Sequence, residues 1–237
     1  MPELESLSCF FPAYDEEANV TRLLDEAVAT LARFATRWEA IVVDDGSRDR
    51  TAELVAQYAA AHPEVRLVRH ERNLGYGHAL RTGFEACTGE AIFFTDADLQ
   101  FRLEELAALL PAFEQADVVI GYRIRRQDPW HRRFVARVYH VALRTMFGLK
   151  VHDIDCAFKL FRRPVIDALL GHLESRSAFI SPELIIRAQL AGFRIAEVGV
   201  HHYPRTAGAP KGATPKVIAR TIGEMARLRG ALREPTR

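Results

Sequence analysis

An apolar run meets two carboxylates in the stretch Phe93-Phe94-Thr95-Asp96-Ala97-Asp98-Leu99-Gln100. The uninterrupted apolar residues 91–94 predict a buried strand of a parallel sheet. Asp96 and Asp98 follow at once, and in open α/β sheets the ligand crevice lies beyond the carboxyl ends of the strands. We therefore expect a functional site at the end of this strand.

The polar residues of this stretch share oxygen donor atoms. Asp96, Asp98 and the Gln100 amide are hard ligands that suit Mg²⁺ or Mn²⁺, with a substrate phosphate completing the shell. Aspartates are also common turn formers after strands, so capping of the next turn is the alternative interpretation. The stretch alone leaves both interpretations open.

Strands and helices alternate along the first half of the chain. Apolar runs predict strands at residues 4–11, 40–43, 65–68, 91–95 and 117–120. Helical patterns and caps predict helices at residues 17–35, 51–60, 78–87 and 103–115, the second of them capped by Asp49 or Thr51. This alternation with short turns is typical of an α/β fold with a mostly parallel, twisted sheet and helices on both faces.

The second half of the chain adds two basic amphipathic helices, expected at residues 130–147 and 216–232. Between them we expect strands at 157–161 and 194–200, a short helix from Pro164, and a helix that begins at Ser181 and ends near Gly192. No linker-like segment interrupts this pattern, so we expect one domain over residues 1–237.

The charge of the chain is unevenly distributed. The formal net charge is +1, yet residues 121–150 carry eight Lys or Arg against one Asp, and residues 205–237 carry eight against two Glu. Such polarity predicts a face that meets an anionic partner, either a membrane, a phosphate ligand or nucleic acid. No nucleic-acid-binding motif occurs and the aromatic residues are not interleaved with the basic clusters, which argues against nucleic acid.

Cysteine usage and hydropathy indicate the compartment. The three cysteines lie far apart without metal-ligand spacing, so we expect reduced thiols in a cytoplasmic protein. We expect neither export nor a membrane span, because no export signal and no apolar run of roughly 18 residues occurs. The two basic helices predict peripheral association with an anionic membrane surface, and a solvated basic face on packed helices is the alternative.

Polar residues also follow the other expected strands. Asp44 and Asp45 either form a turn or accept hydrogen bonds from a nucleotide base or ribose. Tyr14 can pack against a base, and Glu16 either binds there or caps a helix. The segment Gly75-x-Gly77 lacks the third glycine of a dinucleotide fingerprint, because position 80 is Leu, and this argues against a Rossmann oxidoreductase.

Five motifs occur in order along the chain: Pro12-Ala13-Tyr14-Asp15-Glu16-Glu17, Val42-Val43-Asp44-Asp45-Gly46-Ser47-x-Asp49-x-Thr51, Asn73-x-Gly75-x-Gly77, Asp96-Ala97-Asp98-Leu99-Gln100 and Cys156-Ala157-Phe158-Lys159-Leu160-Phe161. From about residue 7 to about residue 205 the chain resembles glycosyltransferase family 2, and within it the dolichyl- or polyprenyl-phosphate sugar (mannose or glucose) synthases. The resemblance implies a GT-A fold, a nucleotide-diphosphate sugar donor of the GDP-mannose or UDP-glucose type, and inverting transfer to a lipid phosphate. It also implies a divalent metal, Mg²⁺ or Mn²⁺, at Asp96, Asp98 and Gln100.

The resemblance further implies roles for individual residues at the motif positions. Those expected to hold the nucleotide sugar are Pro12, Tyr14, Glu16, Asp44, Asp45, Gly77 and Asp96. Those expected to face the acceptor phosphate are Arg123, Arg137 and Lys159, and those expected to be catalytic are Asp98, Arg123, Arg137 and Asp155. The chain departs from many relatives at Tyr76, where they carry Lys, and at His140, where they carry Asn.

We therefore expect an inverting, metal-dependent hexosyltransferase that uses a polyprenyl or dolichyl phosphate at the cytoplasmic face of a membrane. The main alternative is a family 2 enzyme of cell-envelope glycan synthesis that acts on a sugar or other hydroxyl. A hydroxyl needs a positioned base, for which Asp153 and Asp155 are candidates, whereas a phosphate monoester with a second pKa of about 6 needs positive charge more. A sugar-phosphate nucleotidyltransferase is disfavoured because residues 12–17 contain no glycine and no basic residue.

Overall fold

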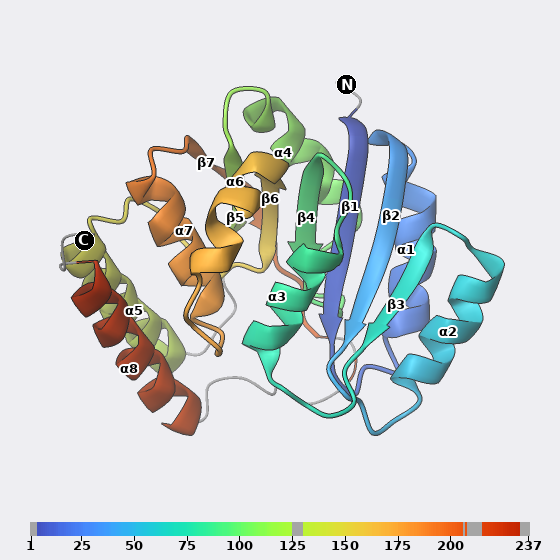
Figure 1. Cartoon of the computed structure of the whole chain (residues 1–237), viewed down its shortest axis with the longest axis horizontal. Helices are drawn as coiled ribbons and strands as arrows, with labels where there is room; N and C mark the ends of the chain where they lie inside the picture. Colours follow the sequence, from blue (N-terminus) through green and yellow to red (C-terminus); the bar gives the residue numbers. More distant parts are fainter. Residues whose placement is uncertain (1–3, 125–129, 206, 208–214, 233–237) are drawn as a thin grey trace.

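A seven-stranded sheet in the order β3-β2-β1-β4-β6-β5-β7 organises the described part of the chain (Figure 1). The computed structural model describes residues 4–124, 130–205, 207 and 215–232, without the side chains of 130–136 and 215–218. The strands are β1 (Leu4–Ala13), β2 (Ala35–Asp44), β3 (Val65–Arg69), β4 (Ala91–Thr95), β5 (Val118–Ile124), β6 (Phe158–Arg162) and β7 (Ile195–His201). The central strand β4 is buried throughout, which is why its sequence is an apolar run.

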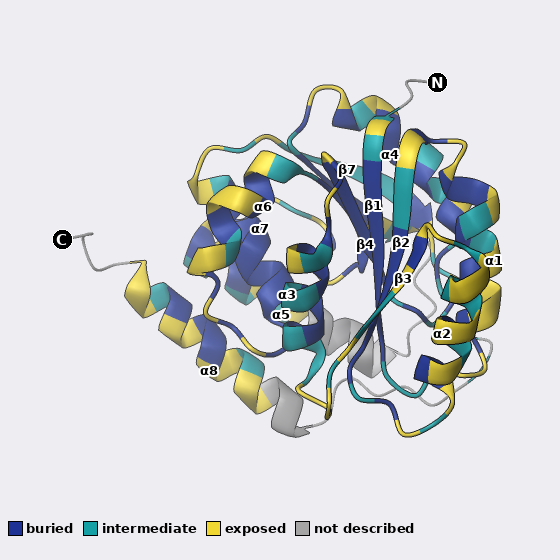
Figure 2. Ribbon diagram, turned by 45° about the vertical axis from the view of Figure 1, so that its right-hand side comes forward, coloured by how far each residue is buried: buried dark blue, intermediate teal, exposed yellow. Residues whose placement is uncertain are grey.

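Helices cover both faces of this sheet. They are α1 (Val20–Leu31), α2 (Thr51–Ala61), α3 (Tyr76–Ala86), α4 (Leu106–Phe113), α5 (Trp130–Phe147), α6 (Arg163–Leu169), α7 (Ile180–Leu190) and α8 (Pro215–Ala231). Successive residues of β1 point to opposite faces of the sheet. Phe11 packs in the core formed with α1 and α4, whereas Phe10 packs in the core formed with α3, α6 and α7. In Figure 2 the helices turn buried residues toward the sheet and exposed residues outward. Every helix in the described residues is too short or too polar to span a bilayer.

Strand β6 is the exception in an otherwise parallel sheet. It runs antiparallel to both β4 and β5, and Phe158 at its start lies opposite Thr95 at the end of β4. The residues that precede β6 therefore reach the same edge of the sheet as the residues that follow β1, β2 and β4. We name this edge the carboxyl edge. The expectation of a mostly parallel sheet with helices on both faces is confirmed.

Four expected elements have wrong boundaries. The helix expected at residues 17–35 occupies only Val20–Leu31, and β2 begins at Ala35 rather than at residue 40. Pairing with β1, in which Ala35 lies opposite Leu4, draws these polar residues into the sheet. The helix expected at 103–115 is divided into a 3-10 turn, Leu103–Glu105 (η1), and α4, which ends at Phe113. The strand expected at 117–120 continues to Ile124 because β7 pairs alongside it.

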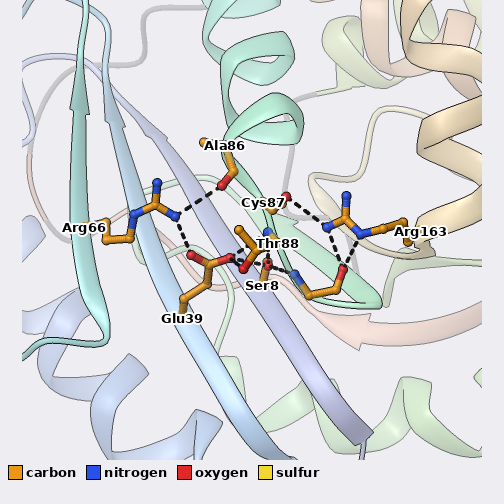
Figure 3. A network of polar contacts seen from close by, with 8 residues as sticks. Ser8, Glu39, Arg66, Ala86, Cys87, Thr88 and Arg163 are labelled. Carbon is orange, nitrogen blue, oxygen red and sulfur yellow. Dashed lines mark hydrogen bonds and ion pairs between the residues drawn. The ribbon is translucent and has the colours of Figure 1, made fainter.

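A polar network holds the opposite, amino-terminal edge of the central strands together (Figure 3). Glu39 Oε1 accepts hydrogen bonds from Ser8 Oγ at 2.6 Å, Thr88 N at 2.8 Å and Thr88 Oγ1 at 2.7 Å, and Oε2 accepts one from Arg66 Nη1 at 2.6 Å. Burial opposes the charge on Glu39, but these hydrogen bonds outweigh it and lower the pKa of the carboxyl below its ordinary value. The network thus ties the connection between α3 and β4 to β1 and β2.

Candidate active site

Two loops at the carboxyl edge hold each other in place. The loop after β1 donates backbone hydrogen bonds from Asp15 to Ser47 Oγ, from Glu16 to Thr51 Oγ1 and from Glu17 to Asp49 Oδ2, at 2.9, 2.8 and 3.0 Å. The loop after β2 donates in return from Arg48 N to Asp15 Oδ1 at 2.8 Å and from Arg50 N to Glu17 Oε2 at 3.0 Å. Several acidic and hydroxyl side chains of these two motifs therefore bond the two loops to each other.

Asp44 and Asp45, both expected to hold the nucleotide, point to different partners. Asp44 is fully buried, and its Oδ1 accepts a hydrogen bond from Ser47 N at 3.1 Å while its Oδ2 lies 3.2 Å from Arg69 Nε. Asp45 lies against His70 Nδ1 at 2.7 Å and accepts from Leu74 N at 2.9 Å and from Gly75 N at 2.8 Å. Both oxygens of Asp45 are thus used to order the loop that leads into α3.

Two glycines allow the loops to approach this closely. Gly46 has φ +68°, and a Cβ there would lie 2.4 Å from the backbone carbon of Arg72. A Cβ on Gly77 would lie 2.5 Å from the backbone carbon of Arg176. Gly77, expected beside the nucleotide sugar, is therefore a position where α3 packs directly on the segment before α7. Two more residues expected there lie where β1 ends, Pro12 as a buried residue of the strand and Tyr14 as a half-buried residue just after it.

Asp96 and Asp98 lie close together beyond the end of β4. Asp96 Oδ1 accepts a hydrogen bond from the Tyr76 hydroxyl at 2.8 Å, and Asp98 Oδ1 accepts one from Gln100 N at 3.2 Å. Burial, and next the charge of Asp98, raise the pKa of Asp96 to about 7, and burial likewise raises the pKa of Asp98. Leu99, between Asp98 and Gln100, takes the left-handed conformation, with φ +59°. Two carboxylates are therefore confined where their charges repel.

This donor set fits a divalent cation that is shared with a ligand. A doubly charged cation would relieve the repulsion between Asp96 and Asp98, and carboxylate oxygens are the ligands that Mg²⁺ and Mn²⁺ prefer. Gln100, the third expected ligand, lies at the same turn, where its Nε2 donates to Tyr203 O at 3.2 Å. Within the described ranges no group of three His, Cys, Asp or Glu is arranged around a metal position, so other oxygens must complete the shell.

Arg205 joins this acidic region from the far end of the chain. Its guanidinium bonds Glu16 Oε1, lies 3.5 Å from Asp98 Oδ2, and donates from Nε to Ala207 O at 2.8 Å. Glu16, expected to hold the nucleotide, also accepts from Asn19 Nδ2 at 2.7 Å. Arg205 was not predicted as a site residue, because it lies in a Gly, Pro and basic stretch that carries no motif.

Basic side chains lie at the same edge of the sheet on β5 and β6. Arg123 makes a two-pronged contact with Asp153, from Nε to Oδ2 at 2.6 Å and from Nη2 to Oδ1 at 2.7 Å. Lys159 is 1% exposed, and its Nζ donates to Cys156 O at 2.5 Å. Burial lowers the pKa of Lys159 although Cys156 and Asp155 oppose this shift. Protein contacts therefore hold both side chains, of which Lys159 is buried and Arg123 is partly buried.

Helix α5 borders the same region. Arg137 is exposed on this helix, and Asp155 is an exposed residue of the segment before β6. Asp155 Oδ2 lies 3.7 Å from His140 Nε2, a buried nitrogen that makes no hydrogen bond in the structure. Burial, and then Asp155, raise the pKa of the neighbouring Tyr139. The structure thus brings Asp155 and His140 together, a pairing that the sequence did not indicate.

Comparisons with known proteins match most of the chain to one family. The family described as "Glycosyl transferase family 2" matches residues 8–170. The chain is 32% identical over 219 residues to "Undecaprenyl-phosphate 4-deoxy-4-formamido-L-arabinose transferase" of Pectobacterium carotovorum, covering 91% of this chain and 65% of the relative. It is 34% identical over 207 residues to "Dolichyl-phosphate beta-glucosyltransferase ALG5C" of Trichomonas vaginalis, covering 80% of this chain and 61% of the relative. The chain thus spans about 61–65% of the length of these curated relatives.

Solved structures support the fold assignment. The fold matches that of glucosyl-3-phosphoglycerate synthase from Mycobacterium tuberculosis with a TM-score of 0.73 at 22% sequence identity, covering 95% of this chain and 80% of that one. The expected GT-A fold is therefore confirmed. Because the family match extends over most of the chain, the protein belongs to glycosyltransferase family 2.

Proposed function

We propose that the protein is a metal-dependent, inverting glycosyltransferase that moves a hexose from a nucleotide-diphosphate sugar to a polyprenyl phosphate. The observation that carries this proposal is that two confined carboxylates, Asp96 and Asp98, share one edge of the sheet with the buried Lys159 and the partly buried Arg123. The names of both curated relatives specify a polyprenyl-type phosphate, which supports this class of acceptor. In this proposal residues 1–237 form one domain.

The acidic side of the site would hold the donor. Asp96, Asp98 and Gln100 would bind Mg²⁺ or Mn²⁺, which when bound neutralises negative charge on a leaving diphosphate. Tyr14 at the end of β1 would lie against the base. Arg205 would exchange its contacts with Glu16 and Asp98 for the diphosphate, because the guanidinium is already placed between the two carboxylates.

The basic side of the site would hold the acceptor. A phosphate monoester has a second pKa of about 6 and is largely dianionic at neutral pH, so its oxygen attacks without a base to remove a proton. Such an acceptor needs positioned positive charge, which Arg123 supplies in the orientation that Asp153 imposes. Lys159 would add a buried cation, and Arg137 on α5 would also contact the acceptor phosphate. Asp155 would orient these cations.

A second candidate function is transfer to a hydroxyl acceptor. The observation that favours it is the approach of His140 Nε2 to Asp155 Oδ2 at 3.7 Å, since a carboxylate beside an imidazole is an arrangement able to take a proton from a hydroxyl. In that reaction Asp155 or His140 would be indispensable, whereas Arg123 and Arg137 would matter less.

The two candidates separate in one set of assays. Radiolabelled UDP-glucose and GDP-mannose are offered with polyprenyl phosphate or with the matching polyprenol, and product formation is followed by extraction. For a phosphate acceptor we expect product only with the phosphate, a loss of at least about tenfold in Arg123→Ala and Arg137→Ala, and a measurable rate in Asp155→Asn. An inactive Asp155→Asn that still binds donor, together with nearly normal arginine variants, would establish the hydroxyl acceptor instead.

Where the reaction takes place follows from the acceptor. A polyprenyl phosphate resides in a membrane, so we propose that the protein acts while bound peripherally at the cytoplasmic face. In support of this, α5 exposes Val138 and Val141, and α8 exposes Ile222, on helices that carry basic residues.

A further inference from the structure

A chain of hydrogen bonds runs along the carboxyl edge from the end of β2 to the end of β4. Asp45, just after β2, accepts from Leu74 N at 2.9 Å and from Gly75 N at 2.8 Å. The next residue, Tyr76, begins α3 and donates its hydroxyl proton to Asp96 Oδ1 at 2.8 Å. Asp45 and Asp96 are thus linked through a loop and one phenol.

We propose that Tyr76 is a positioning residue for the metal site, and that Asp45 acts one step further away by holding Tyr76. The hydroxyl fixes one oxygen of Asp96 and leaves the other available to a cation beside Asp98. This inference rests on the proposed metal-dependent function and adds two residues to it.

The direction of the hydrogen bond follows from the chemistry of its partners. A phenol is protonated at neutral pH, and Asp96 would be ionised when it ligates a cation and could then only accept, so in the metal-bound site the proton would lie on the tyrosine side. A donor to a carboxylate that ligates a metal restricts the rotation of that carboxylate and shapes its affinity for the metal.

The backbone of Tyr76 is held from both sides, so its hydroxyl cannot follow Asp96 freely. Gly75, with φ +98°, turns the chain into α3 on the Asp45 side, and Gly77 packs directly on the backbone of Arg176. His70 adds a brace, because its Nδ1 lies 2.7 Å from Asp45 Oδ1 and its Nε2 lies 3.0 Å from Thr82 Oγ1 in α3. A rigid donor of this kind positions Asp96 rather than adapting to it.

The test compares Tyr76→Phe with Tyr58→Phe, a control that removes the same kind of hydrogen bond away from the site. Tyr58 in α2 donates its hydroxyl proton to Asp25 Oδ1 at 2.9 Å, so both substitutions delete one phenol-to-carboxylate hydrogen bond. Mn²⁺ binding is measured by electron paramagnetic resonance of the free ion, alone and with UDP or GDP. We expect Tyr76→Phe to weaken Mn²⁺ binding about tenfold, and Tyr58→Phe to leave it unchanged. Urea unfolding of both metal-free variants reports any purely structural effect.

A double-variant cycle tests the role given to Asp45. Asp45→Asn should also weaken Mn²⁺ binding, because an amide oxygen cannot hold both backbone N–H groups as a carboxylate does. If Asp45 acts through Tyr76, the double variant should bind Mn²⁺ about as weakly as the weaker single variant. Losses that multiply instead would overturn the link between the two residues.

Failure of this inference is distinguishable from failure of the proposed function. Wild-type affinity for Mn²⁺ in Tyr76→Phe, in a protein whose wild type transfers sugar to polyprenyl phosphate, would overturn the inference alone. Weakened Mn²⁺ binding in Tyr76→Phe, with no transfer by the wild type to polyprenyl phosphate, would overturn the proposed acceptor and leave the inference standing. A wild type that binds no Mn²⁺ with either nucleotide would overturn both.

Discussion

Asp98 is the residue whose replacement separates a metal ligand from a turn former. Its carboxylate accepts from Gln100 N and lies near Arg205, so either role is compatible with its contacts alone. We expect Asp98→Asn to fold normally and to lose Mn²⁺-dependent nucleotide binding, because an amide lacks the charge that a divalent cation requires. In the wild type, nucleotide diphosphate at a hundredfold excess over Kd should raise Tm by about 5–10 °C, and only when Mn²⁺ is present.

The contrary outcomes for Asp98→Asn are specific. Unfolding of the variant in the absence of ligands would favour the turn-forming role. Normal turnover by a folded variant would remove Asp98 from the site.

The position of several site residues could be predicted from the sequence, but their contacts could not. The apolar run predicted β4 and placed Asp96 and Asp98 beyond its end, where strand ends gather at one edge of an α/β sheet. The contact between Arg205 and Glu16 could not be predicted from the sequence, since 189 residues separate the pair. Asp45 was expected at the nucleotide, but its oxygens bind backbone groups of a loop about thirty residues further along the chain. Residue type and spacing indicated where polar groups gather and not which partner each one takes.

At the scale of elements, the Glu39 network makes the connection between α3 and β4 depend on pH. The pKa of Glu39 is lowered in the folded state, so its carboxylate stabilises the fold above its unfolded-state pKa, and this contribution is lost as the pH falls through the folded-state pKa. We expect Glu39→Gln to lower the free energy of unfolding by about 1–3 kcal/mol at pH 7, with a smaller difference below about pH 4. Urea titrations across this pH range measure the difference.

A matched control is available for this prediction. Glu53 in α2 is paired with Arg50 at 3.0 Å on the surface, and exposed ion pairs contribute little to stability. Glu53→Gln should therefore leave the urea midpoint nearly unchanged at both pH values. Equal effects of the two substitutions would contradict a special role for the Glu39 network.

Most elements were predictable because their patterns are local. The basic helices α5 and α8 and the strands β4 and β6 lie within one residue of their expected bounds, since apolar periodicity determined each of them. The early start of β2 was not predictable, because Thr36 and Arg37 are polar and join the sheet only through pairing with β1. The antiparallel direction of β6 is likewise a property of the tertiary structure.

At the scale of the whole molecule, we expect the surfaces of α5 and α8 to bind anionic membranes. Val138 and Val141 in α5 are 54% and 56% exposed, and Ile222 in α8 is 53% exposed. Flotation with anionic liposomes should be strong at low salt, weaken as salt rises, and be lost in a Val138→Glu, Val141→Glu double variant.

The control for flotation lies on α7. Leu190 is 55% exposed there, so Leu190→Glu changes hydropathy equally at a different surface and should leave flotation intact. Equal flotation with neutral and anionic vesicles, or none with either, would instead favour a solvated basic face.

The position of β6 in the sequence also determines when the edge of β4 becomes paired during synthesis of the protein. The half-sheet β3-β2-β1-β4 is complete once residue 95 has left the ribosome, yet β4 then has no neighbour on its outer side, because β6 begins only at Phe158. During the intervening interval a nascent chain presents an apolar, unpaired edge of the kind that joins other chains. Premature termination before residue 158 should therefore yield an aggregating fragment, whereas the completed chain closes its own edge.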